Sequence, residues 1–416
     1  NTFTSQWFVN LVDNVGLDSV PHVVFGNVLD MTVPDLIATL STFDITTQTG
    51  NGALTDVPLS DTPASLNGDF VVVSGVTVSI VPSSTSTDTD GNDLIFGAGG
   101  ADSVFGSDGN DTISGDAGDD TLDGGNGDDE FVWDNGDGSD MIDGGAGRDV
   151  QTVNFGDLAA EGDVVTVTDG GGGRVNVARS AGATLGAFAL DLGTVETIEL
   201  NLLDGDDIVD ASTSPIGLTI NGGDGADSVS GSAFVDRING DAGDDTMEGG
   251  DGDDIYTVDS TGDTVTELAG EGIDIVETSV ALTAPDHVEQ VRLTVPGALD
   301  LIANATGTWL IGNEDANSLT GAAGDDRLQG NGGDDTLTGL GGNDLITGLA
   351  GNDTIKGGPG LDIIRGGAED DILVGGAGKD RLFGEAGDDR LDGGGGSDRL
   401  LGLSGNDTIN GNAGND

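Results

Sequence analysis

The segment GAAGDDRLQGNGGDDTLTGLGGNDLITG, from Gly321 to Gly348, shows a nine-residue period that continues to the last residue of the chain. An aspartate recurs at every ninth position, a glycine stands five residues before it, and a leucine or isoleucine follows it by two residues. The aspartates in phase are Asp326, Asp335, Asp344, Asp353, Asp362, Asp371, Asp380, Asp389, Asp398, Asp407 and Asp416.

Each repeat divides into a six-residue turn and a three-residue strand. Glycine allows the positive φ that a tight turn needs, and the middle residue of the strand points to one face. Stacked coils can then align their aliphatic side chains as a thin core, which one repeat cannot build alone. The fold expected for these segments is therefore an all-β, parallel β-roll solenoid.

The aspartates of such a stack would repel one another. Basic side chains cannot neutralise this repulsion, because the chain has only 12 Lys and Arg against 76 Asp and Glu. A hard dication with oxygen ligands removes this repulsion and takes its remaining ligands from turn carbonyls. The sequence thus predicts Ca²⁺ as cofactor. The alternative is a disordered Gly/Asp-rich tract. The fixed aliphatic position argues against disorder when calcium is present, and we expect disorder without calcium.

The nonapeptide G-G-x-G-x-D-x-U-x resembles the hemolysin-type, or RTX, calcium-binding repeat family. The resemblance implies a β-roll with two nonapeptides in each coil, so that ions on one side lie between residues eighteen apart, such as Asp335 and Asp353. It also implies an extracellular or cell-surface protein, in which the β-rolls fold on export.

Two shorter arrays and two β-rich inserts precede this array, which we bound at residues 317–416. The first array spans residues 88–150 and is followed by an insert at 151–220. It contains a two-residue slip near Trp133, and we interpret Trp133 as a cap on the apolar stack. The second spans 221–255 and is followed by an insert at 256–316. The insert at 151–220 is expected to continue the stack without turn ligands. The candidate metal ligands in these arrays are Asp93, Asp102, Asp111, Asp120, Asp129, Asp140, Asp149, Asp227, Asp236, Asp245 and Asp254.

Two positions weaken the pattern. Phe234 replaces a turn glycine before Asp236, and Asn317 stands where the third array would have its first aspartate. We expect one doubtful turn at the first position and a weaker ligand at the second.

Residues 1–65 have a different composition, and residues 66–87 read as a strand and a linker. The motifs Ser5–Asn10 (SQWFVN), Leu17-Asp18 with His22–Val28 (HVVFGNV), and Gly52–Leu59 (GALTDVPL) resemble the C-terminal half of a cyclophilin-type peptidyl-prolyl isomerase. The resemblance implies a partial β-barrel with one helix, which would begin near Thr32. It places Gln6, Phe8, Leu17 and His22 in a proline pocket that would bind prolyl peptides.

The catalytic arginine of that family belongs to its N-terminal half, and the first cation of this chain is Arg148. We therefore expect the parent protein to be an isomerase and this segment to be inactive. The alternative is that Gln6, Phe8 and His22 have only a structural role, as residues of a β-sheet and its core. The chain begins at Asn1 without methionine and stops within a repeat, so we expect a fragment.

Composition excludes several other functions. The formal net charge of −64 makes nucleic acid and anionic membranes poor partners. There is no cysteine for disulfides or thiolate zinc sites, and two histidines cannot form an H-E-x-x-H motif with this spacing. No apolar run is long enough for a transmembrane helix. The remaining alternative is a structural or adhesive surface protein with a non-catalytic cyclophilin remnant, and polysaccharide binding by the inserts is an option by family analogy alone.

Overall fold

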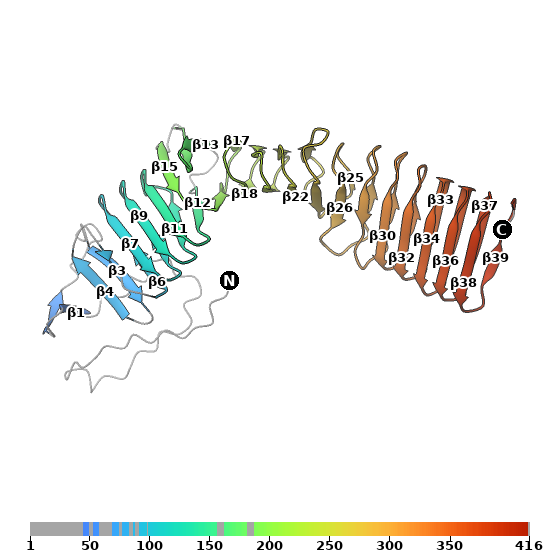
Figure 1. Cartoon of the computed structure of the whole chain (residues 1–416), viewed down its shortest axis with the longest axis horizontal. Helices are drawn as coiled ribbons and strands as arrows, with labels where there is room; N and C mark the ends of the chain where they lie inside the picture. The colour runs from blue at the N-terminus through green and yellow to red at the C-terminus, as the bar shows by residue number, and fades with distance from the viewer. Residues whose placement is uncertain are drawn as a thin grey trace. The chain divides into compact units, whose positions relative to one another are not determined.

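The structure, a computed structural model, describes residues 91–414 except 98, 156–161 and 181–186, and the backbone of five strands between residues 45 and 87. The described residues contain strands and turns and no helix (Figure 1). The part of the chain with described positions therefore has no helix that could span a membrane. The helix expected after Thr32 lies outside the described residues.

The chain divides into two compact units. The first comprises residues 1–154, 170–178 and 186–198, and the second comprises 155–169, 179–185 and 199–416. In each unit parallel strands lie in rows, and successive strands along the chain alternate between two facing rows, so that one coil contributes a strand to each.

The first unit opens with two antiparallel hairpins. Strand β1 (Ile45–Thr49) pairs with β2 (Ala53–Val57), and β3 (Asp69–Ser74) pairs with β4 (Thr77–Pro82). Strand β3 also pairs antiparallel with β6 (Asp93–Phe96), the first strand of a parallel row. Residues 66–87, expected to form a strand and a linker, thus contain the hairpin of β3 and β4 and the short strand β5.

The solenoid of the first unit follows these hairpins. One row contains β6, β8 (Thr112–Ser114), β10 (Glu130–Asp134) and β12 (Val150–Asn154). The other contains β5 (Ser86–Thr87), β7 (Ser103–Asp108), β9 (Thr121–Asn126), β11 (Met141–Ala146) and β15 (Phe188–Gly193). Two further strands, β14 (Arg174–Arg179) and β16 (Thr197–Asn201), reach the division between the units.

The second unit has one long row and two shorter ones. The long row contains β18 (Leu218–Asp224), β20 (Arg237–Ala242), β22 (Ile255–Val258), β24 (Ile275–Thr278), β26 (Gln290–Leu293), β28 (Trp309–Ile311), β30 (Arg327–Gly332), β32 (Leu345–Ala350), β34 (Ile363–Ala368), β36 (Arg381–Ala386) and β38 (Arg399–Ser404). The second row contains β13 (Val164–Gly171), β17 (Ile208–Thr213), β19 (Ser228–Ser230), β21 (Thr246–Glu248) and β23 (Thr264–Thr266). The third contains β25 (Leu282–Thr283), β27 (Asp300–Ile302), β29 (Ser318–Thr320), β31 (Thr336–Thr338), β33 (Thr354–Gly360), β35 (Ile372–Gly378), β37 (Arg390–Gly395) and β39 (Thr408–Asn410).

The register confirms two nonapeptides per coil. Leu328 pairs with Ile346 and Ile346 with Ile364 in one row, while Leu337 pairs with Ile355 in the facing row. These side chains are at most 1% exposed, and they form the core between the rows. The all-β parallel β-roll expected from the period is confirmed.

Trp133 differs from its expected role as a cap. It is 1% exposed in β10, which has β8 on one side and β12 on the other, so it lies inside the stack. Its ring packs on Phe188 with centroids 4.0 Å apart, and its indole N–H donates to the carbonyl of Gly138. The two-residue slip is absorbed in the turn after β10, where the Asp137 N–H donates to the Asp134 carbonyl.

Candidate metal centres

The repeat aspartates stand in ladders along the turns. The backbone N–H of most of them donates to Oδ1 of the aspartate one coil further on, at N···O distances of 2.7 to 3.1 Å. In the first array the pairs are Asp93–Asp111, Asp102–Asp120, Asp111–Asp129, Asp120–Asp140 and Asp129–Asp149. In the second they are Asp227–Asp245 and Asp236–Asp254. In the third they are Asp326–Asp344, Asp335–Asp353, Asp344–Asp362, Asp353–Asp371, Asp362–Asp380, Asp371–Asp389, Asp380–Asp398 and Asp389–Asp407.

The second carboxylate oxygen of most ladder aspartates is buried without a hydrogen-bond partner. Unpaired buried polar atoms are rare in folded proteins, and each one indicates a missing water or ion, or strain. The Oδ2 atoms concerned belong to Asp102, Asp120, Asp129, Asp149, Asp207, Asp227, Asp245, Asp254, Asp335, Asp344, Asp353, Asp362, Asp371, Asp380 and Asp389.

The glycine five residues before each aspartate explains where this oxygen lies. A Cβ built on Gly339 would overlap Oδ2 of Asp344 and would lie 2.7 Å from the carbonyl oxygen of Gly357, one coil further on. Gly330 has the same relation to Asp335 and to the carbonyl of Gly348, at 2.9 Å. A carboxylate oxygen and a backbone carbonyl oxygen thus face one small space, which only glycine leaves open.

Electrostatics make this arrangement unfavourable without a cation. Burial is the main cause that raises the pKa of Asp335 and Asp371 to about 7, and the charges of neighbouring aspartates add to it. The same causes raise the pKa of Asp353 and Asp362 to about 6, against the lowering effect of the backbone N–H donor. A cation beside Oδ2 would offset both effects. The donors are oxygens alone, which is the set that Ca²⁺ prefers.

The arrays match the RTX calcium-binding nonapeptide repeat. The family model, which covers four copies of the unit, matches residues 85–113, 96–131, 219–265, 311–346, 338–373, 365–400 and 392–416. These repeats bind calcium in a β-roll, which agrees with the ladders and the parallel coils. Asp140 and Asp149 continue the first ladders beyond the matched segments. A search of curated proteins finds no match to the chain.

At three ladder positions, Asp236, Asp326 and Asn317, hydrogen bonds within the protein already satisfy the side-chain atom that is left unpartnered at most other positions. The Ser232 N–H and hydroxyl both donate to Oδ2 of Asp236, at 2.6 and 2.9 Å, while Phe234 points outward and is 48% exposed. The Ala322 N–H donates to Oδ2 of Asp326 at 2.6 Å. Asn317 accepts the Asn313 N–H and donates to the carbonyls of Gly297 and Leu299.

The remaining candidate ligands, Asp140, Asp398 and Asp407, also accept ladder hydrogen bonds. Oδ1 of Asp140 accepts the Asp120 N–H at 2.9 Å, and Asp398 accepts the Asp380 N–H at the same distance. Asp407 accepts the Asp389 N–H at 3.1 Å and is half-buried near the end of the stack.

The ladders also include residues that the nine-residue pattern missed. The Asp163 N–H donates to Asp207, and the Asp207 N–H to Asp227, so ladder carboxylates are also present in the insert at 151–220, which we expected to continue the stack without turn ligands. Glutamates end two ladders: Glu196 accepts the Asp149 N–H and Glu289 accepts the Asp274 N–H, at 2.8 and 2.9 Å. The signal that could have found Asp207 is its spacing of twenty residues from Asp227, as in the slip of the first array.

A second, exposed ladder runs through the residue before each repeat aspartate. Oδ1 of Asp334 accepts the N–H of Asn352, and Oδ1 of Asn352 accepts the N–H of Asp370, at 2.8 and 3.2 Å. Oδ1 of Asp370 in turn accepts the N–H of Asp388. The recurrent dipeptides Asp-Asp and Asn-Asp are the sequence signal of this ladder, which needs only a side-chain oxygen.

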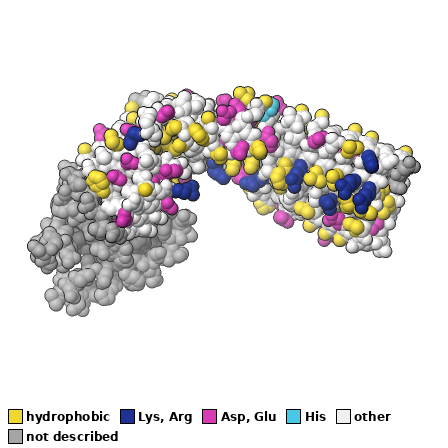
Figure 2. Space-filling model, in the orientation of Figure 1, with side chains coloured by type: hydrophobic (Ala, Val, Ile, Leu, Met, Phe, Trp, Pro, Cys, Tyr) yellow, Lys and Arg dark blue, Asp and Glu magenta, His cyan; other side chains and the backbone are white. Residues whose placement is uncertain are grey.

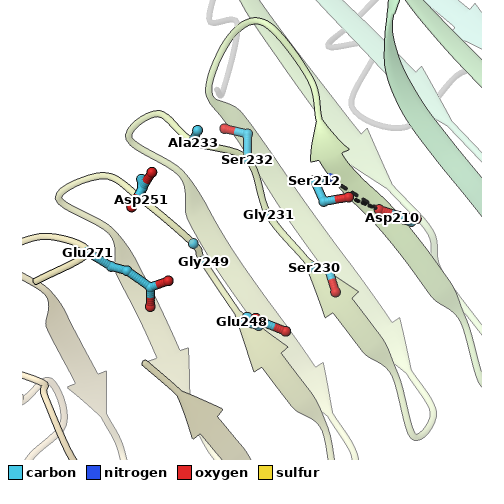
Figure 3. Close-up of a pocket in the computed structure, with 11 residues that line it drawn as sticks. Asp210, Ser212, Ser230, Gly231, Ser232, Ala233, Glu248, Gly249, Asp251 and Glu271 are labelled. Carbon is cyan, nitrogen blue, oxygen red and sulfur yellow. Dashed lines mark hydrogen bonds between the residues drawn. The ribbon is translucent and has the colours of Figure 1, made fainter. Parts of the chain in front are cut away.

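A polar hollow of about 410 Å³ lies beside β17, β19 and β21 (Figure 3). Figure 3 shows that Asp210, Ser230 and Glu248 come from successive strands, and the Ser212 hydroxyl donates to Asp210 at 2.6 Å. The lining consists of serines, glycines, one alanine and carboxylates. Because no histidine, cysteine or cation stands among these lining residues, the hollow does not favour a catalytic centre.

The proposed proline-pocket residues Gln6, Phe8, Leu17 and His22 lie outside the described residues.

Proposed function

We propose that the three arrays bind several Ca²⁺ ions along their aspartate ladders and that this binding folds the chain. The observation that supports the proposal is the row of buried Oδ2 atoms that no protein donor satisfies, several of which lie beside a glycine carbonyl, as at Asp335, Asp344 and Asp362. The ligands would be the ladder aspartates with such an oxygen, together with turn carbonyls. Asp236 and Asp326 are the weakest of the sequence candidates, because their second oxygens already accept hydrogen bonds.

Coupling of binding to folding follows from charge. The chain carries a formal net charge of −64, and its buried carboxylates stack directly above one another. Without cations the folded state brings these charges together, whereas the unfolded chain separates them. Ions that bind the folded state and not the unfolded chain therefore contribute directly to the free energy of folding.

The test is a calcium titration of the full chain from chelated protein, followed by circular dichroism and calorimetry. We expect little β signal in chelator and a cooperative rise as free calcium reaches about 10⁻⁴ to 10⁻³ M, the range typical of extracellular modules. Magnesium at the same concentrations should produce a smaller rise, because it demands octahedral geometry and sheds water reluctantly. A β signal of full size in chelator, unchanged by calcium, would contradict the proposal.

We further propose that the parent protein is secreted or displayed at the cell surface and carries a cyclophilin-type domain. The support is the ordered set of motifs that contains Ser5–Asn10 and His22–Val28. A prolyl-isomerase assay on the full-length parent tests the activity, with His22→Ala as the variant. Measurable, His22-dependent isomerisation favours the enzyme, and binding of prolyl peptides without turnover favours the structural or adhesive alternative.

A further inference from the structure

The turn between β23 and β24 departs from the nonapeptide in a way that changes its chemistry. Met247 pairs with Val265 and Glu248 with Thr266, so the next position of the stack aligns Gly249 with Glu267. Glu267 therefore occupies the place that the repeat reserves for glycine. The turn is two residues longer than a repeat turn, which puts Asp274 twenty residues after Asp254 rather than eighteen.

Glu267 brings a third carboxylate into the space beside the ladder. Ligand oxygens of Asp254, Glu267 and Asp274 all lie within 4.8 Å of one another. Their exposed fractions are 0%, 5% and 1%. None of the ion pairs found among the described residues involves any of the three. Three buried carboxylates without a neutralising partner are costly, since each buried charge normally requires a partner or a metal ion.

Half of the oxygens in this cluster are accounted for by the protein. Oδ1 of Asp254 accepts the Asp236 N–H at 2.7 Å, and Oδ1 of Asp274 accepts the Asp254 N–H at 2.9 Å. The hydroxyl of Tyr256, which is fully buried, donates to Oε1 of Glu267. Oδ2 of Asp254 and Oε2 of Glu267 remain buried without a hydrogen-bond partner.

Oxygens of Asp254, Tyr256 and Glu267 lie close together beside Gly249. A Cβ built on Gly249 would overlap both Oδ2 of Asp254 and the Tyr256 hydroxyl, so these atoms meet above that glycine. The tyrosine hydroxyl in turn holds Glu267. The turn that carries Glu267 is closed by Glu271, whose carboxylate accepts the Leu268 N–H at 2.5 Å and whose carbonyl accepts the Gly252 N–H at 2.8 Å.

We propose that Asp254, Glu267 and Asp274 bind one hard divalent cation of the Ca²⁺ class, with Tyr256 as the residue that positions Glu267. Such a cation takes carboxylate oxygens, and its affinity rises with the number of charged ligands. The site differs from the repeat turns, since three side-chain carboxylates supply it and its third ligand replaces a glycine. It shares Asp254 with the second array but does not depend on calcium binding elsewhere in the arrays.

The single tyrosine of the chain makes this site separately visible. Terbium(III) replaces calcium at oxygen sites, and its emission is sensitised by an aromatic ring close to the ion. The full chain is titrated with Tb³⁺ under ultraviolet excitation, and the emission of Tyr256→Phe is subtracted from that of the wild type. The three tryptophans contribute equally to both proteins, so the difference reports an ion beside Tyr256.

We expect the difference to contain Tb³⁺ emission sensitised by Tyr256, the Tyr256 component, which disappears when calcium displaces the Tb³⁺. Glu267→Gln should lower the affinity for this ion by at least about tenfold, a loss seen even for residues that only support a metal ligand. Glu267→Gly, which restores the repeat residue, should abolish the component and lower the calorimetric ion count by one. Glu248→Gln is the matched control, because it removes an exposed carboxylate from the coil that precedes Glu267 and should change neither readout.

Two outcomes would overturn the proposal. One is coincident emission of wild type and Tyr256→Phe, which would mean that no ion lies beside the tyrosine. The other is a component that persists unchanged in Glu267→Gln and Glu267→Gly, which would assign the ion to an ordinary repeat turn. Circular dichroism in calcium identifies any variant that fails to fold, and the conservative Glu267→Gln then decides. The β signal of the arrays is recorded in the same samples, so failure at this site is distinguishable from failure of the repeats to bind calcium.

Discussion

Each repeat aspartate uses its two oxygens differently. Oδ1 of Asp353 accepts the Asp335 N–H, a bond that asparagine could also accept, whereas Oδ2 is buried without a protein partner. The outer ladder shows that asparagine is sufficient where only an acceptor is needed, because Asn352 there accepts the Asp370 N–H. The negative charge of the repeat aspartate is therefore needed to bind the ion rather than to accept the ladder hydrogen bond.

Asp353→Asn tests this division of roles. We expect the calcium-saturated free energy of unfolding to fall by about 1–3 kcal/mol, the usual cost of an unsatisfied buried group, and the calcium midpoint to rise. Asp334→Asn makes the same change in the exposed ladder one coil away and should leave the free energy of unfolding nearly unchanged. Urea unfolding at fixed free calcium measures both. Equal effects of the two variants would show that the inner charge has no special role.

Asp236 and Asp227 form a sharper comparison within one array. Both are at most 2% exposed, but Ser232 already satisfies Oδ2 of Asp236. We expect Asp227→Asn to lower the calorimetric number of calcium ions and Asp236→Asn to leave it unchanged. Asp236→Asn should still destabilise the fold, since its amide would oppose a backbone donor. A lower ion count in Asp236→Asn would show that calcium displaces Ser232.

At the scale of the element, the turn is shaped by the glycine that faces the carboxylate. Gly348 has an unremarkable φ, so its role is steric rather than conformational: a Cβ there would overlap Oδ2 of Asp353. Gly341 lies in a neighbouring turn, also without a positive φ, and the nearest atom to its Cβ position is 3.9 Å away. Among the repeat glycines without a positive φ, some are thus sterically required and others are not.

Gly348→Ala should fill the space proposed for an ion. We expect it to reduce the calcium-saturated stability by about 1–3 kcal/mol, as overpacking does, and to remove an ion from the calorimetric count. Gly341→Ala should leave both quantities nearly unchanged, because its methyl group makes only ordinary contacts. If Gly348→Ala bound as many ions as the wild type, the space above the glycine could not be the calcium site.

The outer faces of the strands contribute a different kind of stability. The guanidinium of Arg327 lies 4.1 Å from the ring centroid of Trp309, its direct partner on the adjacent strand. Arg365 and Arg381 lie over the ring of Phe383 at 4.9 and 5.5 Å. Cation–π pairs of this kind contribute about 0.5–1 kcal/mol at exposed sites. Trp309–Arg327 and Arg365–Phe383 join neighbouring coils without using the turns, whereas Arg381 and Phe383 lie on the same strand, β36.

At the scale of the whole molecule, charge is unevenly distributed. Seven of the twelve cations belong to the third array, and Figure 2 shows lysine and arginine gathered on the part that contains it. These seven are Arg327, Lys356, Arg365, Lys379, Arg381, Arg390 and Arg399. The first array has Arg148 alone and the second Arg237 alone, so we expect these two arrays to depend more strongly on calcium for neutralisation.

Acid should partly replace calcium as the agent that folds the chain. Burial raises the pKa of ladder carboxyls to about 6 or 7 from an ordinary value of 3.8, for example in Asp120, Asp207 and Asp353. A group whose pKa is raised in the folded state stabilises that state at low pH and loses this contribution as pH rises through 6 to 7. In chelator, β signal should therefore grow as pH falls from about 8 to about 5, which stays above the isoelectric point near 4.1.

The same linkage predicts weaker calcium binding in acid, since protons and calcium compete for the same carboxylates. Circular dichroism at fixed pH, with and without chelator, measures both effects. A chelated chain whose spectrum is constant between about pH 8 and about pH 5 would mean that the ladder carboxyls do not control folding.

Much of this architecture was predictable from local pattern. The phase of Asp335 and Leu337 predicted the inward aliphatic residue, and the family resemblance implied the pairing of coils eighteen residues apart; the registers confirm both. The division into a six-residue turn and a three-residue strand is wrong for much of the third array, where β33 and β35 each run for seven residues. Calcium followed from the same phase, because stacked aspartates with oxygen donors and few cations call for a hard dication. A repeat of this kind encodes its own register, so each unit carries the information that places its neighbours.

The tertiary structure alone decided which oxygens remain available. Asp236, Asp326 and Asp353 look alike in sequence, yet donors from Ser232 and Ala322 occupy the first two and leave the third unpartnered. Glu267 stands at the usual eighteen residues after Gly249, but the longer turn that follows it sets Asp274 twenty residues after Asp254, and the three carboxylates then lie together. The physical reason is that hydrogen-bond satisfaction depends on atoms one coil or one irregular turn away, and a nine-residue pattern carries no information about them.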